Sequence, residues 1–107
     1  MYRLIVMNGC RILQKYDQEW KTTGLIKRVE GDIKPGIYNL FLSESVQKNQ
    51  SYRGLLLFVD KKENIIYQKT GQGYVKHDAR FFGKKPPIGK IVTIQYRGGA
   101  EAQVINN

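Results

Sequence analysis

Turn-forming residues interrupt the apolar pattern of this chain about every 8 to 12 residues, most regularly in its second half. Asn8-Gly9 suits the positive φ angles of a type I′ hairpin turn, and Pro35-Gly36 and Gly71-Gln-Gly73 are further turn signals. The apolar runs between these turns are short, and several alternate with polar residues, which is typical of β-strands. The pattern therefore predicts short strands joined by tight turns.

The expected fold is mainly β, with an α+β fold as the alternative. It would be a small curled antiparallel sheet or an OB or SH3-like barrel, with an N-terminal hairpin and one or two short helices. With 107 residues, 41% of them hydrophobic, the chain can bury one sizeable core. The apolar run 54–59 predicts a strand buried on both faces. The expected strands cover residues 2–7, 11–16, 37–42, 54–59, 65–69, 74–77, 90–96 and 102–105.

Other stretches predict connections or short helices. Residues 17–23 are polar around Trp20 and are predicted to form a helical turn or a loop, in which Trp20 packs as an anchor. Residues 25–33 are ambiguous between strand and helix, and the polar residues 43–52 predict a connection. Asp78–Phe82 is predicted to form a short helix with Asp78 near its N-terminus.

Charge is distributed unevenly along a chain that we expect to form a single domain, residues 1–107. The formal net charge is +9, from 18 Lys and Arg against 9 Asp and Glu. Residues 1–45, the expected N-terminal hairpin or extension, hold 7 basic and 5 acidic residues. The expected basic barrel-like half, residues 46–107, holds 11 basic and 4 acidic residues. Such an excess favours an anionic partner, either nucleic acid or an acidic protein, over a membrane.

Cysteine usage and the apolar runs predict a cytoplasmic protein. Cys10 is the one cysteine, so the chain forms no internal disulfide and has too few thiols for a structural zinc site. The N-terminal apolar run, residues 4–7, is shorter than a signal peptide needs, and no run approaches the length of a membrane span. Cys10 is expected to be a packing residue, with a Cys10–His77 nucleophile pair as the alternative.

The segment Tyr67–His77 combines aromatic, basic and glycine residues. On paired strands, Tyr67 and Tyr74 are expected to share a face with Lys69 and Lys76, a combination that stacks bases and neutralises phosphates. The alternative is structural, because tyrosine rings often cap a core and scattered lysines often form a solvated face. The predicted nucleic-acid-binding residues are Tyr67, Lys69, Tyr74, Lys76, His77, Arg80, Lys84, Lys85 and Arg97, with Lys90 in the same half.

No catalytic motif accompanies these residues, so we expect a protein that is not an enzyme and has no cofactor or metal. Gly71 and Gly73 are expected to supply positive φ angles at a structural hairpin turn. A phosphate loop is the alternative, but the pair completes neither Gly-x-Gly-x-x-Gly nor a Walker motif. His77 and Asp78 could form half of a catalytic dyad, yet no nucleophile motif lies nearby. A hydrogen-bonded structural role for His77 is therefore favoured.

A series of short motifs runs through the chain from Pro35 to Tyr96. They are Pro35-Gly36-Ile-Tyr38, Tyr52-Arg-Gly54, Tyr67-Gln68 with Gly71 and Gly73, Val75-Lys-His77, Pro87-Ile-Gly89 and Val92-Thr-Ile94-Gln-Tyr96. This succession, over about residues 35–104, resembles the KfrB-like domain, which occurs in accessory proteins of conjugative plasmids and at the ends of some larger mobile-element proteins. The resemblance implies a plasmid or mobile-element binding module without catalytic residues. The matching positions Tyr67, Gln68, Gly71, Gly73 and His77 are expected to be either structural or contact residues.

Two hypotheses follow for the function. The leading one is a small basic module that binds DNA or RNA with little sequence preference through its second half, by means of backbone charge. The alternative is a protein-interaction module in plasmid maintenance or conjugation, which docks an acidic partner or adds a strand to a partner at an exposed sheet edge. The salt dependence of binding distinguishes the two hypotheses, because salt weakens an apolar interface less than it weakens contacts between charges.

Overall fold

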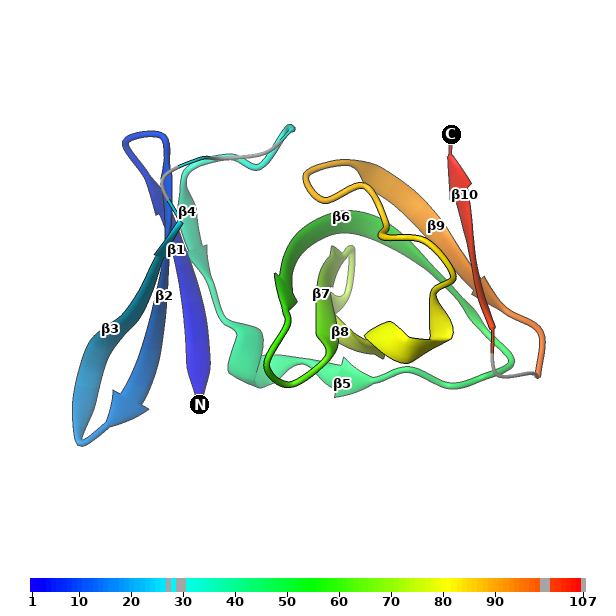
Figure 1. The fold of residues 1–107 in the computed structure, drawn as a ribbon, viewed down its shortest axis with the longest axis horizontal. Helices are drawn as coiled ribbons and strands as arrows, with labels where there is room; N and C mark the ends of the chain where they lie inside the picture. The colour runs from blue at the N-terminus through cyan, green and yellow to red at the C-terminus, as the bar shows by residue number, and fades with distance from the viewer. Residues whose placement is uncertain (27, 29–30, 99–100, 107) are drawn as a thin grey trace.

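Two β-sheets and two short 3-10 helices make up the computed structural model, which describes residues 1–26, 28, 31–98 and 101–106 (Figure 1). One sheet has four strands in the order β3-β2-β1-β4, and the other has six in the order β10-β9-β6-β7-β8-β5. The prediction of a mainly β fold is confirmed. Within the described ranges, no helix has the length and apolar character needed to cross a membrane.

The first sheet begins with the expected hairpin. β1 (Tyr2–Met7) and β2 (Cys10–Asp17) pair antiparallel on either side of Asn8-Gly9. Asn8 has a φ of 52° and Gly9 a φ of 74°, the positive values that a type I′ turn requires. The turn dipeptide therefore fixes both the position and the register of this hairpin.

β3 (Glu19–Ile26) pairs antiparallel with β2, so the prediction of a loop or helical turn over residues 17–23 is wrong. The chain reverses at Gln18, whose φ is 64°. An edge strand with a solvated face can be as polar as a loop while its backbone still pairs, and for this reason the composition was misleading. Trp20 does act as an anchor: its ring centroid lies 5.3 Å from that of Tyr16 and 5.9 Å from that of Phe41.

β4 (Gly36–Tyr38) pairs with the other side of β1, and η1 (Leu40–Leu42) follows it. The strand predicted at 37–42 is therefore wrong beyond residue 38. The N–H groups of Leu42 and Ser43 bond to carbonyls three residues earlier, and Leu40 of this turn is buried. In the ambiguous stretch 25–33, Leu25 belongs to β3 and Ile33 is buried before β4, while Val29 lies outside the described residues.

The second sheet contains the remaining strands. After β8 comes η2, the short helix that was predicted there. The Asp78 side chain accepts a hydrogen bond from the Arg80 N–H at the start of this helix. Figure 1 shows β6 arching around β7 and β8. The sheet is curled as expected, but it stays open between its edge strands β10 and β5, so the closed barrel is wrong. β5 interrupts the predicted connection 43–52 and pairs in parallel with β8, which makes the sheet mixed. The bounds are β5 (Glu44–Ser45), β6 (Ser51–Asp60), β7 (Ile65–Thr70), β8 (Gly73–Asp78), η2 (Ala79–Phe81), β9 (Ile91–Tyr96) and β10 (Ala102–Asn106).

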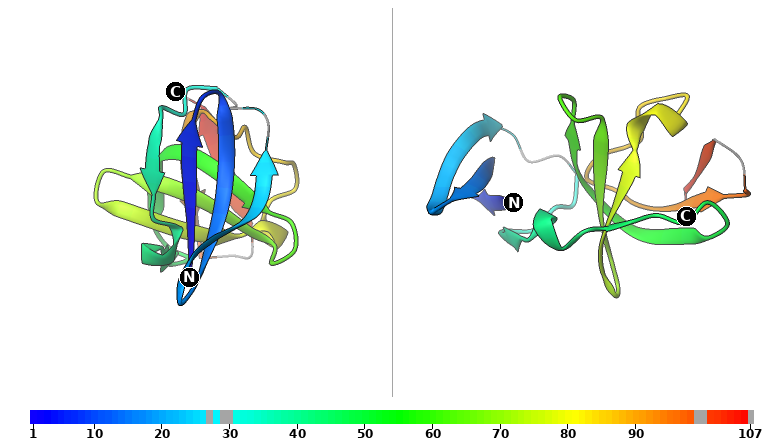
Figure 2. Two further views of the ribbon diagram at one scale, coloured as in Figure 1. Left: turned by 90° about the vertical axis from the view of Figure 1, so that its left-hand side faces the viewer. Right: turned by 90° about the horizontal axis from the view of Figure 1, so that it is seen from below.

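The two sheets share one hydrophobic core, and Figure 2 shows them side by side. Leu4 and Val6 of β1 belong to the same buried cluster as Ile66 of β7. In β6 the register shifts between Leu56 and Phe58, and both Leu56 and Leu57 are fully buried although they are consecutive. The expected strand with two buried faces is thus present, and a local bulge accompanies it.

Gly54 lies where β6 approaches β7 too closely for a side chain. A Cβ atom built on Gly54 would overlap the carbonyl oxygen of Lys69. We expect Gly54→Ala to lower the free energy of unfolding by about 2 to 3 kcal/mol, because the two strands must move apart. Gly83→Ala is the matched control, since open space surrounds Gly83. Urea denaturation measures both variants, and equal stabilities would contradict this explanation.

Candidate nucleic-acid interface

The β7–β8 hairpin brings together the four residues that were expected to share a face. Tyr67 pairs with Lys76, and Lys69 pairs with Tyr74. Opposed residues, and every second residue along a strand, point to the same side of a sheet, so the four side chains lie on one face. Of the two glycines at the hairpin, only Gly73 has a positive φ, of 147°. The expected structural turn is present, but the positive φ expected for Gly71 is not.

Burial removes Tyr67 from the predicted binding surface. Its side chain is only 7% exposed and belongs to the core cluster. Met1, Tyr2, Leu40 and Phe41 line a pocket beside it, so the ring lies under the N-terminal sheet and η1. Burial also raises the pKa of the Tyr67 phenol. This burial is contrary to the predicted base-stacking role of Tyr67, because the ring offers a base almost no accessible surface.

Lys69 and Tyr74 remain accessible toward the free end of the hairpin. Lys69 is exposed and Tyr74 is half-buried, and the Lys69 Nζ lies 5.9 Å from the centroid of the Tyr74 ring. That separation is near the outer limit of a cation–π contact. Lys76 is half-buried and lines two pockets. We call Lys69, Tyr74 and Lys76 the hairpin patch.

A polar groove of about 470 Å³ adjoins the hairpin patch at Tyr74. Gln47 and Gln50 line it from the segment that follows β5, and Tyr52 lines it from β6. The backbone N–H of Gln47 donates to the Tyr52 Oη at 2.7 Å, and the Gln50 Nε2 donates to the Gln47 Oε1 at 3.0 Å. These amide and phenol groups are suited to an uncharged polar ring, with Glu44 as the charged residue of the lining.

Arg80 is engaged in an ion pair with Asp78. The Arg80 Nη2 lies 2.7 Å from the Asp78 Oδ2, and the Arg80 Nε also donates to this carboxylate. Hydrogen bonds from the Arg80 side chain lower the pKa of Asp78 to about 2. The pair therefore carries no net charge at neutral pH, which weakens Arg80 as a phosphate contact.

The remaining predicted cations lie on separate segments. Lys84 and Lys85 are exposed in the stretch after η2, and Lys85 lines a different pocket of about 390 Å³. Lys90 precedes β9 and Arg97 follows it, so these two exposed residues stand at opposite ends of the same strand. The positive charge of the second half is thus divided among several segments.

His77 is buried, which is contrary to its predicted contact with nucleic acid and agrees with the structural alternative. Its side chain is 1% exposed. The imidazole stacks on the Tyr96 ring, with centroids 5.7 Å apart and planes 9° apart. Tyr52 and Phe82 approach the imidazole edge-on at 5.8 Å. The ring is therefore enclosed by aromatic groups inside the curled sheet.

Gln68 and Tyr96 hold the two ring nitrogens of His77. The Gln68 Nε2 lies 3.2 Å from the backbone carbonyls of Tyr52, Gly54 and Val92, so this atom is the donor and the Gln68 Oε1 faces the imidazole. The Oε1 accepts from the His77 Nε2–H at 2.8 Å. The Nδ1 is then the acceptor, and the Tyr96 hydroxyl donates to it at 2.6 Å. The network joins the adjacent strands β9, β6, β7 and β8.

This arrangement keeps His77 neutral in the folded protein. Burial lowers the pKa of His77 to about 4, and burial also raises the pKa of Tyr96. Both ring nitrogens of His77 are held by Gln68 and Tyr96, and Cys10 belongs to β2 of the other sheet, which is contrary to the alternative Cys10–His77 pair. His77 and Asp78 are consecutive on β8 and point to opposite sides, which also removes the alternative dyad.

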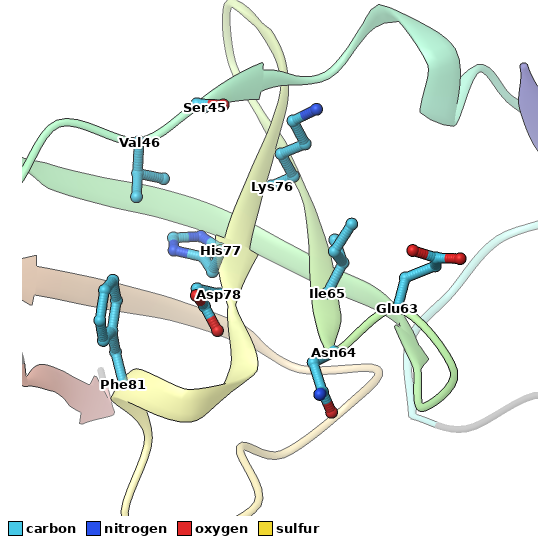
Figure 3. Close-up of a pocket in the computed structure, with 9 residues that line it drawn as sticks. All are labelled: Ser45, Val46, Glu63, Asn64, Ile65, Lys76, His77, Asp78 and Phe81. Atoms are coloured by element: carbon cyan, nitrogen blue, oxygen red, sulfur yellow. The ribbon is translucent and has the colours of Figure 1, made fainter.

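A pocket of about 270 Å³ lies beside His77 at the end of β8 (Figure 3). The figure shows the His77 ring on the side of Val46 and Phe81, with Lys76 on the opposite side of the strand. Glu63 and Asp78 also line the pocket, so its charges are mixed. Such a lining is poorly suited to a phosphate group, and the hairpin patch is the better candidate.

Sequence reasoning gave Gln68 only as a structural or contact position of the family resemblance, and it assigned no role to Tyr96 or Arg11. A polar residue within the buried run of β7 was the available signal for Gln68, and the same signal applies to Arg11 in β2. Arg11 is 6% exposed, and it donates to the backbone carbonyls of Arg28 and Leu57. Arg11 thereby ties the first sheet to the bulge of β6.

This chain is similar to a known protein family and to a curated protein. The family described as KfrB Domain matches residues 51–105, which extend from β6 into β10. Protein TraB of Escherichia coli is 32% identical over 101 residues, which cover 91% of this chain and 66% of that protein. The chain therefore spans just under two thirds of this relative's length. The family match begins later than residue 35, where the resemblance in the sequence began.

Proposed function

Because this chain belongs to the KfrB domain family, we propose that it is a plasmid-related binding module that holds nucleic acid against the β7–β8 hairpin. The observation that carries the proposal is the hairpin patch, in which an exposed lysine lies beside an accessible tyrosine ring. Lysine and aromatic side chains together neutralise phosphates and stack bases. The module is neither an enzyme nor dependent on a cofactor in this proposal.

The geometry of the hairpin favours single strands over duplexes. Tyr74 can stack on a base only where that base is not paired and stacked inside a duplex. The adjoining polar groove offers amide groups to such an unpaired base. Lys69 and Lys76 would contact the phosphates, which carry no sequence information. We therefore expect binding with little sequence preference, in the cytoplasm where a plasmid protein meets DNA and RNA.

Charge reversal in the hairpin patch tests this function. We expect Lys69→Glu/Lys76→Glu to weaken binding to a single-stranded oligonucleotide roughly tenfold at about 50 mM salt and to make the log–log salt slope shallower by about 1.4. Tyr74→Leu should weaken single-strand binding more than duplex binding, because stacking is lost. Fluorescence anisotropy with single-stranded and duplex oligonucleotides measures each affinity.

Lys21→Glu/Lys34→Glu is the matched control, with the same change in net charge at exposed positions outside the second sheet. Its affinity should fall less than that of the hairpin variant. Equal losses would mean that overall charge, and not the hairpin patch, attracts the oligonucleotide. Absence of wild-type binding at low salt would remove the proposal altogether.

Open sheet edges favour a second candidate function, the docking of an acidic protein in plasmid maintenance or conjugation. β3 and β10 each stand at the edge of a sheet, where backbone groups can pair with a strand from a partner. Pull-down with the neighbouring plasmid gene products separates the two functions. A complex that survives high salt, without oligonucleotide affinity, would favour protein docking.

A further inference from the structure

The side of the first sheet that faces away from the core is apolar across all four strands. The register aligns Leu25 of β3, Ile12 of β2, Ile5 of β1 and Ile37 of β4 in one continuous row. Met7 of β1 and Cys10 of β2 form the next pair on the same face of the sheet. We call these six residues the outer row. Figure 2 (left) shows this side of the sheet open toward the viewer.

Exposure of the outer row is unusual for the solvated side of an antiparallel sheet, which is normally polar. Leu25 is 57% exposed, Ile37 is 55% exposed and Met7 is 46% exposed. The opposite side of the same strands carries Leu4, Val6 and Tyr38, all buried in the core. The sheet is therefore apolar on both faces, as in a sheet that packs against other protein layers on each face.

We propose that the outer row binds a second copy of this chain. The chain carries a net charge of +9, so two copies repel each other, and this repulsion is smallest where they meet through a surface that holds little of that charge. By register, Arg3 is the one charged side chain on this side among the described strand residues. Its Nε bonds to Gln14 at 2.8 Å, and its guanidinium lies 4.2 Å from the Trp20 ring centroid.

An acidic protein would instead be attracted to the basic segments of the second half, and the outer row offers it no cation at its centre. Two identical apolar rows, in contrast, can face each other across a two-fold axis, because such an axis brings the same patch of both copies together. Packed sheets keep their strands within about 30° of each other, so the row of one copy can interdigitate with the row of the other.

The area is adequate for a weak dimer. Three strands about 20 Å long and the shorter β4, spaced about 4.8 Å apart, cover roughly 300 to 350 Å² in projection, and the corrugated surface is larger. Two such faces bury on the order of 1,000 Å² in total, which is near the lower limit for a specific interface. The dimer should therefore form and dissociate within an accessible concentration range.

Sedimentation equilibrium tests the proposal, with a reductant present so that Cys10 cannot cross-link two chains. Between about 5 and 500 μM, the average mass of the wild-type protein should rise from that of one chain toward that of two. The midpoint should move to lower concentration as salt screens the repulsion between copies. Because no oligonucleotide is present, this result is independent of the proposed nucleic-acid function.

Leu25→Lys/Ile37→Lys should shift the midpoint at least tenfold toward higher concentration, and Leu25→Ser/Ile37→Ser should shift it in the same direction without added charge. Ile91→Lys/Ile105→Lys is the matched control, because these residues are 51% and 40% exposed and belong to the second sheet. Its midpoint should stay close to that of the wild type. A wild-type protein with the mass of one chain throughout, or equal shifts in the outer-row and control variants, would overturn the proposal.

Discussion

Replacing Gln68 with leucine is expected to lower the free energy of unfolding by about 3 to 5 kcal/mol. Leucine has a similar volume but no polar atoms, so the His77 Nε2–H loses its acceptor in a site that water does not reach. The carbonyls of Tyr52, Gly54 and Val92 lose a shared donor at the same time. Chemical denaturation monitored by circular dichroism measures the loss.

Two further variants make this prediction specific. Gln103→Leu on β10 exchanges the same side chains at an exposed position and should change stability by no more than about 0.5 kcal/mol. Gln68→Leu/His77→Phe should be less damaging than the sum of its single changes, because the unsatisfied His77 N–H is removed. Additive losses would show that Gln68 and His77 stabilise the sheet independently.

Acidification is expected to destabilise the protein between about pH 6.5 and pH 4 by up to about 3 kcal/mol. Burial lowers the pKa of His77 to about 4 in the folded protein. The unfolded chain therefore binds a proton at His77 through this window, while the folded protein binds it only near the lower limit. The stability contributed by the neutral imidazole is complete above pH 6.5 and is lost as the pH falls toward 4.

His77 is the one histidine of the chain, so its ring resonances need no assignment by mutation. An NMR titration should give a pKa near 4 for the folded protein. In His77→Gln, the decrease in the free energy of unfolding between pH 6.5 and 4 should flatten, whatever the stability of that variant at neutral pH. A titration midpoint near 6.5, or an unchanged pH dependence in His77→Gln, would contradict the buried neutral state.

Local sequence signals predicted the elements that depend on neighbouring residues. Asn8-Gly9 located the first hairpin, and the spacing around Gly71 and Gly73 located β7 and β8. The same reasoning failed for β3, whose polar residues pair with β2 at a sheet edge. It also failed for barrel closure, because hydrogen bonding between β10 and β5 depends on the curvature of the whole sheet and not on any short segment.

The candidate site shows the same difference between features set by neighbouring residues and features set by distant ones. Alternation along the strands correctly placed Tyr67 and Tyr74 on one face of the hairpin. It could not distinguish their burial, because the residues that cover Tyr67 come from the chain start and from η1, far away in the sequence. Likewise, His77 and Gln68 are nine residues apart, but they meet Tyr96 only because β9 joins the same sheet.

The shared core has a consequence for how this domain can be recombined between genes. The family match starts at β6, yet Ile66 and Tyr67 within it pack in one cluster with Leu4 and Val6 outside it. A genetic exchange that carried residues 51–105 alone into another protein would also carry an uncovered apolar flank. The recipient would have to provide a replacement for the first sheet, so we expect successful transfers of this segment to include a compatible neighbouring layer.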